Sequence, residues 1–332
     1  MLKIGLIGCG FMGGMHAACY NVIEGAEVVA VADVREEKAK ELAGENAKIY
    51  SDGMSLIENA DVDVIDICLP TYLHTEHAVA AMKKGRKIFL EKPACLTKEE
   101  GKLLLETEKE TGATVQVGQV IRFWDEYKWL KEAYESGKFG KLCSGVFKRL
   151  SSYPTWAWNG WLHDPYKSGT VAQDMHVHDV DFVRYLMGSE PDSFTSNAVR
   201  DERGVIGQIF TSFVFGDACI TVEACWDYPV DFPFDASFRV KFEKATVVLD
   251  GEGLRVYSKD GGCEKVVIAP SFEGDNNIGG NISSLGGYYN ELKYFVEKLN
   301  AGEKPNVVPL SEGIKSTELA LDEIEFVGGV KK

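Results

Sequence analysis

The stretch LKIGLIGCGFMGGMH, residues 2–16, decides the fold of the first part of the chain. It begins with a short apolar run typical of a buried strand, and glycines then follow in the spacing G-x-G-x-x-G. A helix is expected over about residues 12–24. A strand, a glycine turn and a helix in this order predict the opening unit of a doubly wound sheet.

Short β-branched patterns alternate with charged, amphipathic patterns along the next hundred residues or so. Strands are expected in EVVAVAD, AKIYS, DVIDICLP, KIFLEKP and TVQVGQ, with helices between them. This alternation indicates parallel βαβ units, whose crossovers are right-handed. We therefore predict an α/β domain with a doubly wound parallel sheet of the Rossmann type over residues 1–120.

The glycine turn is expected to bind a dinucleotide. Asp33 stands twenty residues past Gly13, where such domains place the acidic residue that binds a ribose. Asp33 would accept both ribose hydroxyls and repel a 2′-phosphate, which favours NAD. Arg35 keeps NADP open, because it can reach a 2′-phosphate or stack on adenine. A plain surface turn is the alternative. The expected contacts here are Gly8, Gly10, Phe11, Met12, Gly13, Asp33 and Arg35.

Ligands of doubly wound sheets lie beyond the carboxyl ends of the strands. The loop at 70–74 and the tripeptide Glu-Lys-Pro at 91–93 follow two strands, so both are expected beside the nicotinamide half. Lys92 is either a solvated lysine or an ammonium that stabilises an alkoxide. His74 either caps the next helix or contacts the cofactor. The expected contacts from these loops are Leu69, Thr71, His74, Glu91 and Lys92.

A different pattern begins after about residue 120. A helix is expected near 125–136 and a strand near 142–150, and closely spaced strand patterns fill the region from about 193 to 269. Strands without intervening helices pair mostly antiparallel. Residues 121–332 are therefore predicted to form an α+β domain with a large open sheet, which binds the substrate and pairs subunits. The Gly/Asn/Ser-rich loop at 269–287 is a candidate lid.

The stretch VAQDMHVHDVD, residues 171–181, gathers histidines and aspartates and raises the question of a metal site. Its secondary structure decides which of these side chains share a face. Thr170 with Gln173 fits a capping box, and Gly188 fits the position just past a helix end. The stretch is therefore predicted to be a helix.

On a helix, Asp174 and His178 are i, i+4 neighbours at the edge of the apolar stripe, whereas His176 points elsewhere. A two-histidine metal site is disfavoured, and no metal is predicted. An Asp/His pair at a cleft margin is favoured, with a histidine that satisfies buried polar groups as the alternative.

Composition limits the partners. The net charge of −15 over 332 residues and the pI of about 5.0 argue against nucleic acid. Residues 4–23 lack charged side chains, but their glycines suit neither a membrane span nor a signal peptide. The eight cysteines form no C-x-x-C pair and are typical of buried hydrophobes. We expect a cytoplasmic protein that acts on a small molecule, without a membrane partner.

These segments together resemble the Gfo/Idh/MocA oxidoreductases, a family that includes inositol dehydrogenases and glucose-fructose oxidoreductase. The resemblance covers essentially the whole chain, and its most specific marks are E-K-P at 91–93 and D-x-x-x-H within residues 171–181. It implies that Lys92 is the catalytic lysine, Asp174 the helix aspartate and His178 the general base. It also implies a cytoplasmic homodimer or homotetramer.

The resemblance implies hydride transfer between NAD(P) and a secondary hydroxyl or keto group of a sugar, polyol or glycoside. The tryptophans of YPTWAWNGW, residues 153–161, would form apolar walls for the substrate, and domain-interface packing is the alternative. Two other functions stay open: an NAD-assisted glycosidase or eliminating enzyme that oxidises C3 transiently, and a nicotinamide-binding regulator without catalysis. The expected substrate-binding residues are Arg122, Trp156, Trp158, Trp161, Asp174 and His178.

Overall fold

The computed structural model describes residues 1–44, 46–272 and 286–329, and the chain divides into two compact units. The first unit comprises residues 1–123 and 271–317, and the second comprises 124–270 and 318–332. The expected second domain, 121–332, differs from this division because the segment 271–317 groups with the first unit. Most of the candidate lid at 269–287 lies outside the described residues.

The sheet of the first unit has six parallel strands in the order β3-β2-β1-β4-β5-β6, which confirms the predicted doubly wound fold. The direction of the strand order reverses between β1 and β4, which is where such sheets bind ligands. The strands are β1 (Leu2–Ile7), β2 (Ala26–Ala32), β3 (Lys48–Tyr50), β4 (Val64–Ile67), β5 (Lys87–Glu91) and β6 (Val115–Gly118).

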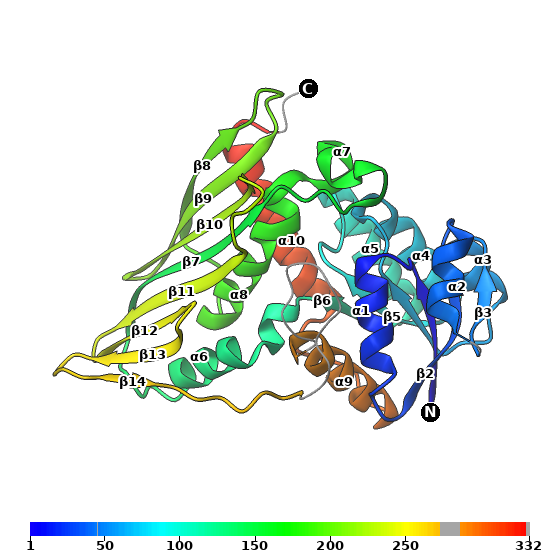
Figure 1. Cartoon of the computed structure of the whole chain (residues 1–332), viewed down its shortest axis with the longest axis horizontal. Coiled ribbons are helices and arrows are strands. Elements are labelled where there is room, and N and C mark those ends of the chain that lie inside the picture. The colour runs from blue at the N-terminus through cyan, green and yellow to red at the C-terminus, as the bar shows by residue number, and fades with distance from the viewer. Residues whose placement is uncertain (45, 273–285, 330–332) are drawn as a thin grey trace. The chain divides into compact units, whose positions relative to one another are not determined.

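Helices pack on this sheet in two groups (Figure 1). Helix α1 packs against α9, while α3, α4 and α5 pack beside one another. Thr97 and Glu100 form the reciprocal bonds of a capping box, which explains why α5 begins where it does. The helices are α1 (Phe11–Tyr20), α2 (Glu36–Ala43), α3 (Gly53–Asn59), α4 (His74–Lys83), α5 (Lys98–Thr111) and α9 (Gly286–Asn300).

The segment 271–317 belongs with the first unit for two local reasons. Helix α9 covers α1, and the backbone N–H of Val117 on β6 donates to the carbonyl oxygen of Val308 at 3.0 Å. Val308 and Ile314 are buried in the same apolar core as Ile7 and Ile65. The strand and helix patterns of the sequence do not indicate these long-range contacts, so the expected boundary overlooks them.

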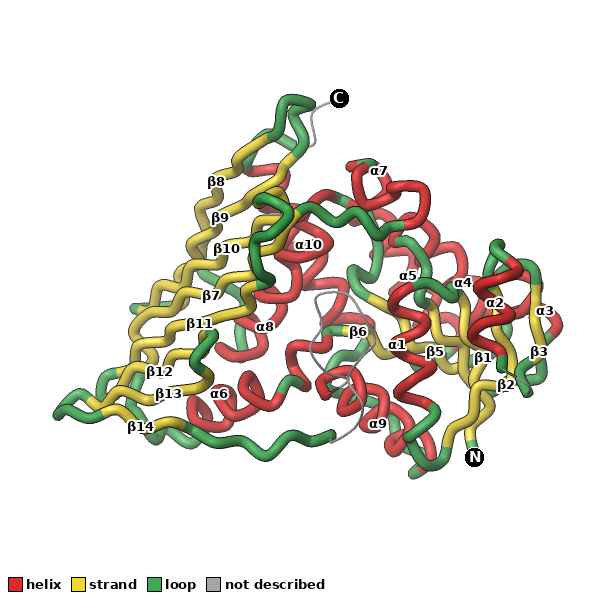
Figure 2. The backbone as a smooth tube through the Cα atoms, in the orientation of Figure 1, coloured by secondary structure: helices red, strands yellow, loops and turns green. Residues whose placement is uncertain are grey.

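The sheet of the second unit has eight strands in the order β14-β13-β12-β11-β7-β10-β9-β8, and Figure 2 shows their long, regular backbone. Pairing is antiparallel except between β7 and β10, which run parallel. The prediction of a large, mostly antiparallel open sheet is confirmed. The strands are β7 (Leu142–Ser152), β8 (Ser193–Arg200), β9 (Ile206–Phe215), β10 (Ala218–Tyr228), β11 (Asp235–Phe242), β12 (Ala245–Asp250), β13 (Gly253–Ser258) and β14 (Cys263–Lys265).

Helices α6 (Asp125–Glu135) and α8 (Val177–Met187) lie along one face of this sheet (Figure 1). The ring of Tyr127 contacts Phe182 and Phe238 edge to face, with ring centres 4.7 and 5.1 Å apart. Burial of apolar surface is the dominant favourable contribution to folding, and these ring contacts add to it. The last helix, α10 (Leu310–Phe326), contributes its residues through Thr317 to the first unit and the remainder to the second.

Within the described residues, every helix falls short of the length and apolar character that a membrane span requires.

Candidate functional site

The glycine turn after β1 is built so that only glycine fits at two positions. Gly8 has φ +95°, and a Cβ there would lie 2.5 Å from the carbonyl oxygen of Cys68, in the loop after β4. A Cβ on Gly13 would lie 1.9 Å from the carbonyl oxygen of Gly8. These close approaches hold the start of α1 against the strand ends.

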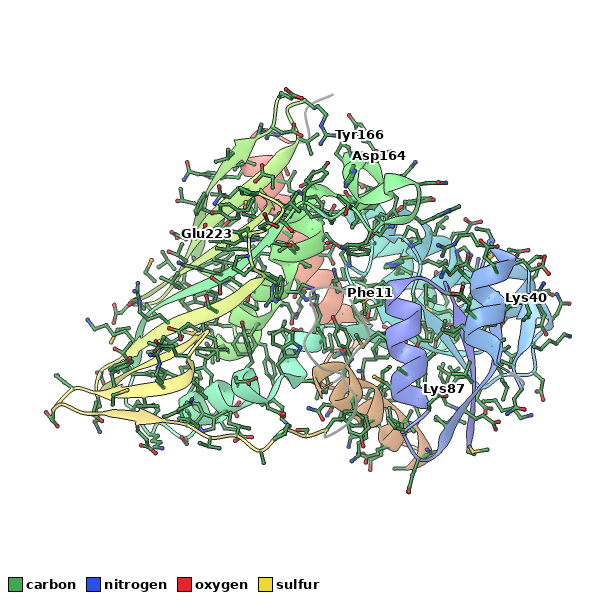
Figure 3. All side chains as sticks on the ribbon, in the orientation of Figure 1. Phe11, Lys40, Lys87, Asp164, Tyr166 and Glu223 are labelled. Carbon is green, nitrogen blue, oxygen red and sulfur yellow. The ribbon has the colours of Figure 1, made fainter. Side chains whose placement is uncertain are left out.

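The N-terminal end of α1 is accessible to an anionic ligand. Gly10 caps the helix, and the atom nearest to an added Cβ would be Arg35 Nη2 at 3.9 Å, so the space beside Gly10 remains accessible. Phe11 begins the helix, as Figure 3 shows, and the first turn carries no acidic residue. The partial positive charge of a helix N-terminus and the bare glycine backbone fit the pyrophosphate of a dinucleotide.

Asp33, at the end of β2, closes the turn from the other side. One carboxylate oxygen accepts the backbone N–H of Cys9 at 2.8 Å, and the other accepts the backbone N–H of Arg35 at 2.8 Å. The Arg35 guanidinium donates to both oxygens, at 2.9 and 2.8 Å. Burial alone would raise the pKa of Asp33, but Arg35 and the two N–H groups outweigh it and hold the pKa below its usual value.

His74 joins the two loops that follow β4 and β5. Its Nδ1 lies 2.8 Å from the carbonyl oxygen of Pro93, and its Nε2 lies 2.8 Å from that of Leu69. The side chain is 1% exposed, and burial lowers the pKa of His74. His74 therefore ties the backbone around the Lys92–Pro93 peptide, which is cis, to the loop at 69–74. Its ring serves as an internal brace rather than only as a helix cap.

Sequence reasoning missed a buried polar cluster formed by His16, Asp66, Cys68 and Glu91. His16 Nδ1 lies 2.9 Å from Asp66 Oδ2 and 3.2 Å from Cys68 Sγ, and Nε2 lies 3.1 Å from Glu91 Oε1. One feature of the sequence could have drawn attention to this cluster, namely a histidine, His16, three residues after Gly13.

In the described part of the chain, His16, Asp66 and Cys68 are the three potential metal ligands that converge. Their separations are those of hydrogen bonds and ion pairs. Burial and the Asp66 carboxylate raise the pKa of Cys68 well above its usual range. The three side chains are joined by hydrogen bonds to the His16 ring and to Asp66.

The stretch 171–181 is helical, as predicted, but it begins differently. Thr170 has φ +68°, outside the usual capping conformation, and its hydroxyl oxygen accepts the N–H of Ala172 at 3.4 Å. The N–H of Gln173 donates to the Gly169 carbonyl oxygen at 3.4 Å instead, so the predicted capping box is wrong. A π-helical turn, Ala172–His176, precedes α8. Such turns are frequent at functional sites. Gly188 ends α8 in the left-handed conformation, as predicted.

Exposure separates the polar residues of this helix. From residue 171 to 183, every described side chain is buried except Asp174, Met175 and His178. His176 instead points into the core, where its Nε2 lies 2.6 Å from Glu323 Oε2. The predicted separation of His176 from the Asp174 and His178 pair agrees with this burial pattern.

The helix that carries Asp174 and His178 is fixed to the sheet by a buried ion pair. Arg149 on β7 donates to both carboxylate oxygens of Asp179, at 2.8 and 3.1 Å. Both residues are buried. Because this pair is bidentate, it sets the rotation of α8 about its axis as well as its distance from the sheet.

The tryptophans before this helix differ in exposure. Trp156 and Trp158 are 59% and 43% exposed, whereas Trp161 packs against the apolar core of the second unit. Arg122, expected at the substrate, is 4% exposed, and its Nη1 donates to the carbonyl oxygen of Val307 at 2.7 Å. That contact gives Arg122 a structural use within the first unit.

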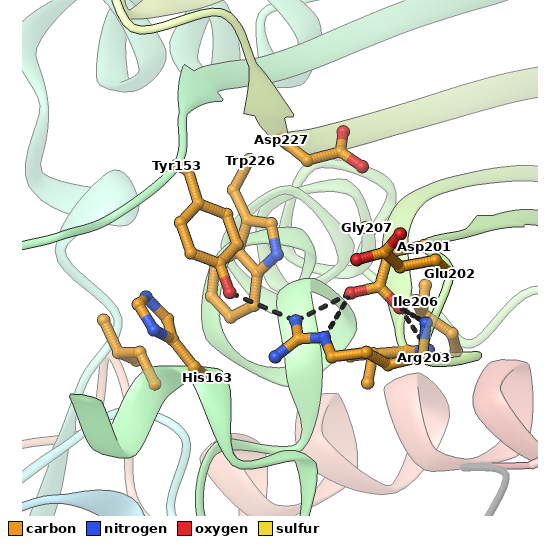
Figure 4. Close-up of a pocket in the computed structure, with 11 residues that line it drawn as sticks. Tyr153, His163, Asp201, Glu202, Arg203, Ile206, Gly207, Trp226 and Asp227 are labelled. Atoms are coloured by element: carbon orange, nitrogen blue, oxygen red, sulfur yellow. Dashed lines mark hydrogen bonds and ion pairs between the residues drawn. The ribbon is translucent and has the colours of Figure 1, made fainter.

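A pocket of about 570 Å³ lies beside Tyr153 and His163, at the two ends of the segment that carries the three tryptophans (Figure 4). The pocket is lined by Tyr153, His163 and Trp226, together with the turn between β8 and β9 around Arg203. The Arg203 Nη2 donates to the Tyr153 hydroxyl at 3.1 Å. Trp156, Trp158, Asp174 and His178 do not line this pocket. It is therefore separate from the side chains that the sequence singles out.

Comparison with known proteins gives a consistent picture. The model of the Gfo/Idh/MocA oxidoreductase family, NAD-binding Rossmann fold, matches residues 2–119, and the model of the Gfo/Idh/MocA C-terminal domain matches residues 127–248. The chain is 29% identical to myo-inositol 2-dehydrogenase of Thermotoga maritima, over 92% of this chain and 90% of that protein.

Two further matches agree. The chain is 32% identical to inositol 2-dehydrogenase 2 of Saccharopolyspora erythraea, over 60% of this chain and 58% of that protein. A crystal structure of a probable dehydrogenase from Thermotoga maritima superposes with a TM-score of 0.80 at 25% identity, covering 98% of this chain and 96% of that one.

Proposed function

The chain belongs to the Gfo/Idh/MocA family of NAD-binding oxidoreductases, and we propose that it oxidises a secondary hydroxyl of an inositol-like polyol or of a sugar. The cofactor is NAD. The glycine turn closed by Asp33 carries this part of the proposal, because its geometry fits a dinucleotide with free ribose hydroxyls. The substrate class is supported by the two inositol 2-dehydrogenases to which the chain is similar.

In the proposed site, Gly8, Gly10 and Gly13 with the start of α1 hold the pyrophosphate, and Asp33 accepts the ribose hydroxyls. Phe11, Met12, Arg35, Leu69, Thr71, His74, Glu91 and Lys92 complete the proposed cofactor contacts. When bound, NAD supplies the hydride acceptor. Trp156, Trp158, Trp161 and Arg122 are the proposed substrate contacts beside Asp174 and His178.

Three side chains carry the proposed proton and charge chemistry. His178 accepts the proton of the substrate hydroxyl, because a neutral imidazole is a suitable base near pH 7. The Lys92 ammonium stabilises the negative charge that develops on the same oxygen. Asp174 orients these groups. The partial exposure of Asp174 and His178, in a stretch from 171 to 183 where only Met175 is also partly exposed, supports their roles.

An absorbance screen at about 340 nm tests the proposal, since reduced nicotinamide absorbs there. NAD and NADP are offered separately with inositols, aldoses, sugar acids and aryl glycosides. Net NADH formation with a polyol or sugar is the expected result. Release of aglycone from an aryl glycoside without net NADH would replace the proposal with a redox-neutral glycosidase. Tight NAD binding without turnover on every compound would replace it with a regulator.

We also propose a homo-oligomer in the cytoplasm. All eight cysteines are without a disulfide partner, which suits a reducing compartment. Light scattering of the purified protein tests the oligomer, with a dimer or tetramer as the expected mass. A monomer at micromolar concentration would contradict it.

A further inference from the structure

The cluster around His16 places a cation between two buried carboxylates of the first unit. His16 comes from α1, Asp66 from β4 and Glu91 from the end of β5. His16 and Asp66 are 0% exposed and Glu91 is 5% exposed. A buried carboxylate without a partner costs several kcal/mol. The fold therefore requires a compensating group at this point.

Only the charged form of His16 satisfies both carboxylates. Nδ1 lies 2.9 Å from Asp66 Oδ2 and Nε2 lies 3.1 Å from Glu91 Oε1. A carboxylate oxygen accepts hydrogen bonds, so both ring nitrogens must donate, which the imidazolium alone does. Burial is the largest single effect and opposes the charge, but Asp66 and Cys68 together outweigh it and raise the pKa of His16 well above its usual value.

Glu91 connects the His16 ring to the backbone of the next residue, Lys92. Its second oxygen, Oε2, accepts the backbone N–H of Lys92 at 3.1 Å. Gly118 at the end of β6 makes room for the carboxylate, because a Cβ there would lie 2.9 Å from Glu91 Oε1. Phe89 supports the His16 ring edge to face, with centres 5.3 Å apart. One carboxylate thus joins the imidazolium to the peptide that begins Lys92.

We propose that His16 is a positioning residue of the reaction, which acts through Glu91 on the backbone of Lys92 and so on the direction of the lysine side chain. The proposal rests on the proposed catalytic role of Lys92. His16 touches neither substrate nor cofactor in this scheme. Its effect is to keep the Glu91 carboxylate in the one orientation that accepts the Lys92 N–H.

The decisive variants are Glu91→Ala and Glu91→Gln. Glu91→Ala removes the link, and kcat should fall at least about tenfold, a larger factor than any loss of NADH affinity measured by fluorescence. Glu91→Gln should recover kcat to within about threefold of the parent enzyme. Its amide oxygen can accept the Lys92 N–H while its amide nitrogen donates to a neutral His16.

Cys68→Ala is the matched control, because Cys68 contacts the same ring on the Asp66 side, away from Lys92. It should leave kcat within about twofold of the parent enzyme. His16→Asn should lower kcat by a factor similar to that of Glu91→Ala. If His16→Asn fails to fold, the Glu91 variants decide the question alone.

A double-mutant cycle separates positioning from general destabilisation. If Glu91 acts through Lys92, Glu91→Ala should lower the residual rate less than about twofold in a Lys92→Met background. An equal loss in both backgrounds would overturn the proposal. Equally, an Ala variant with parental kcat would overturn it.

A second readout needs no substrate. The rate at which the Lys92 amine is acetylated, relative to Lys87 and read by peptide mass spectrometry, should change at least about threefold in Glu91→Ala and not in Cys68→Ala. This measurement remains valid if the proposed function fails. An unchanged labelling ratio would contradict the link between Glu91 and Lys92 in either case.

Discussion

Asp33 and Arg35 form a two-point ion pair at the end of β2, in which the guanidinium donates to both carboxylate oxygens. The same carboxylate also holds the glycine turn through the N–H of Cys9. Arg35, which could bind the 2′-phosphate of NADP, is thus paired with Asp33, the residue proposed to select NAD. The pair links the proposed cofactor choice to the shape of the turn.

Asp33→Ala is predicted to shift cofactor preference toward NADP. It removes the charge that repels a 2′-phosphate and releases the Arg35 guanidinium to bind it. The ratio of kcat/KM for NADP to that for NAD should rise at least about tenfold, or about 1.4 kcal/mol. Glu36→Ala, an exposed neighbour paired with Lys40, should leave the ratio unchanged. An unaltered ratio in Asp33→Ala would mean that specificity lies elsewhere.

Gly13→Ala is predicted to weaken NAD binding at least about tenfold, because the new methyl group would meet the Gly8 carbonyl oxygen and distort the turn. The adjacent Gly14→Ala is the control, since an added Cβ there meets no atom within 4 Å. Titration of NADH fluorescence compares the two. Equal affinities in both variants would show that the turn does not hold the cofactor.

Lys92→Met is predicted to lower kcat by at least about a hundredfold, because it removes the proposed positive charge beside the reacting oxygen. NAD affinity should fall by a much smaller factor than kcat. Lys87→Met, at the start of β5, the strand that ends just before Lys92, is the control and should keep parental turnover. Steady-state rates with the best substrate of the screen measure this. Near-parental turnover in Lys92→Met would exclude the lysine from the chemistry.

His178→Gln and His176→Gln are predicted to differ in kind. The first should lower kcat by about 10²–10⁴ with the thermal midpoint nearly unchanged, since it removes the proposed base. The second should lower the thermal midpoint, because it disrupts the buried bond to Glu323, while kcat per folded molecule stays close to parental. Calorimetry and kinetics on the same samples check both. If His176→Gln lowered kcat and His178→Gln lowered the thermal midpoint, His176 would be the base and His178 the structural residue.

His16 is predicted to stabilise the first unit most at low pH. Its pKa is raised on folding, so the folded state binds more protons and the contribution is fully present below the unfolded value of about 6.5. It is lost as the pH rises through the folded value. The gap in thermal midpoint between the parent and His16→Gln should therefore narrow from about pH 6 toward higher pH. A gap that widens would show that His16 is neutral in the fold.

Local patterns in the sequence predicted most of the fold. The glycine turn and the glycine after α8 are each set by neighbours within a few residues, so they can be read directly. The π-helical start before α8 could not be read this way. It follows Thr170, whose positive φ is uncommon for a residue with a side chain and leaves no signal in the sequence.

The candidate site was predicted in part for the same reason. Asp33 stands at a fixed spacing from the turn, whereas His16, Asp66 and Glu91 are brought together by three separate elements. Separations of 50 and 75 residues leave no periodic signal in one sequence. The burial of Arg122 against the Val307 carbonyl is another contact of this type.

The course of the chain between the two units has a practical consequence for dissecting the protein. The chain passes from one unit to the other after residues 123, 270 and 317, so neither unit is a continuous piece. A fragment that stops near residue 120 would lose α9 and the hydrogen bond between Val117 and Val308, and would expose the apolar surface they cover. Expression of the cofactor unit alone therefore calls for a new covalent connection that carries residues 286–317 along with it.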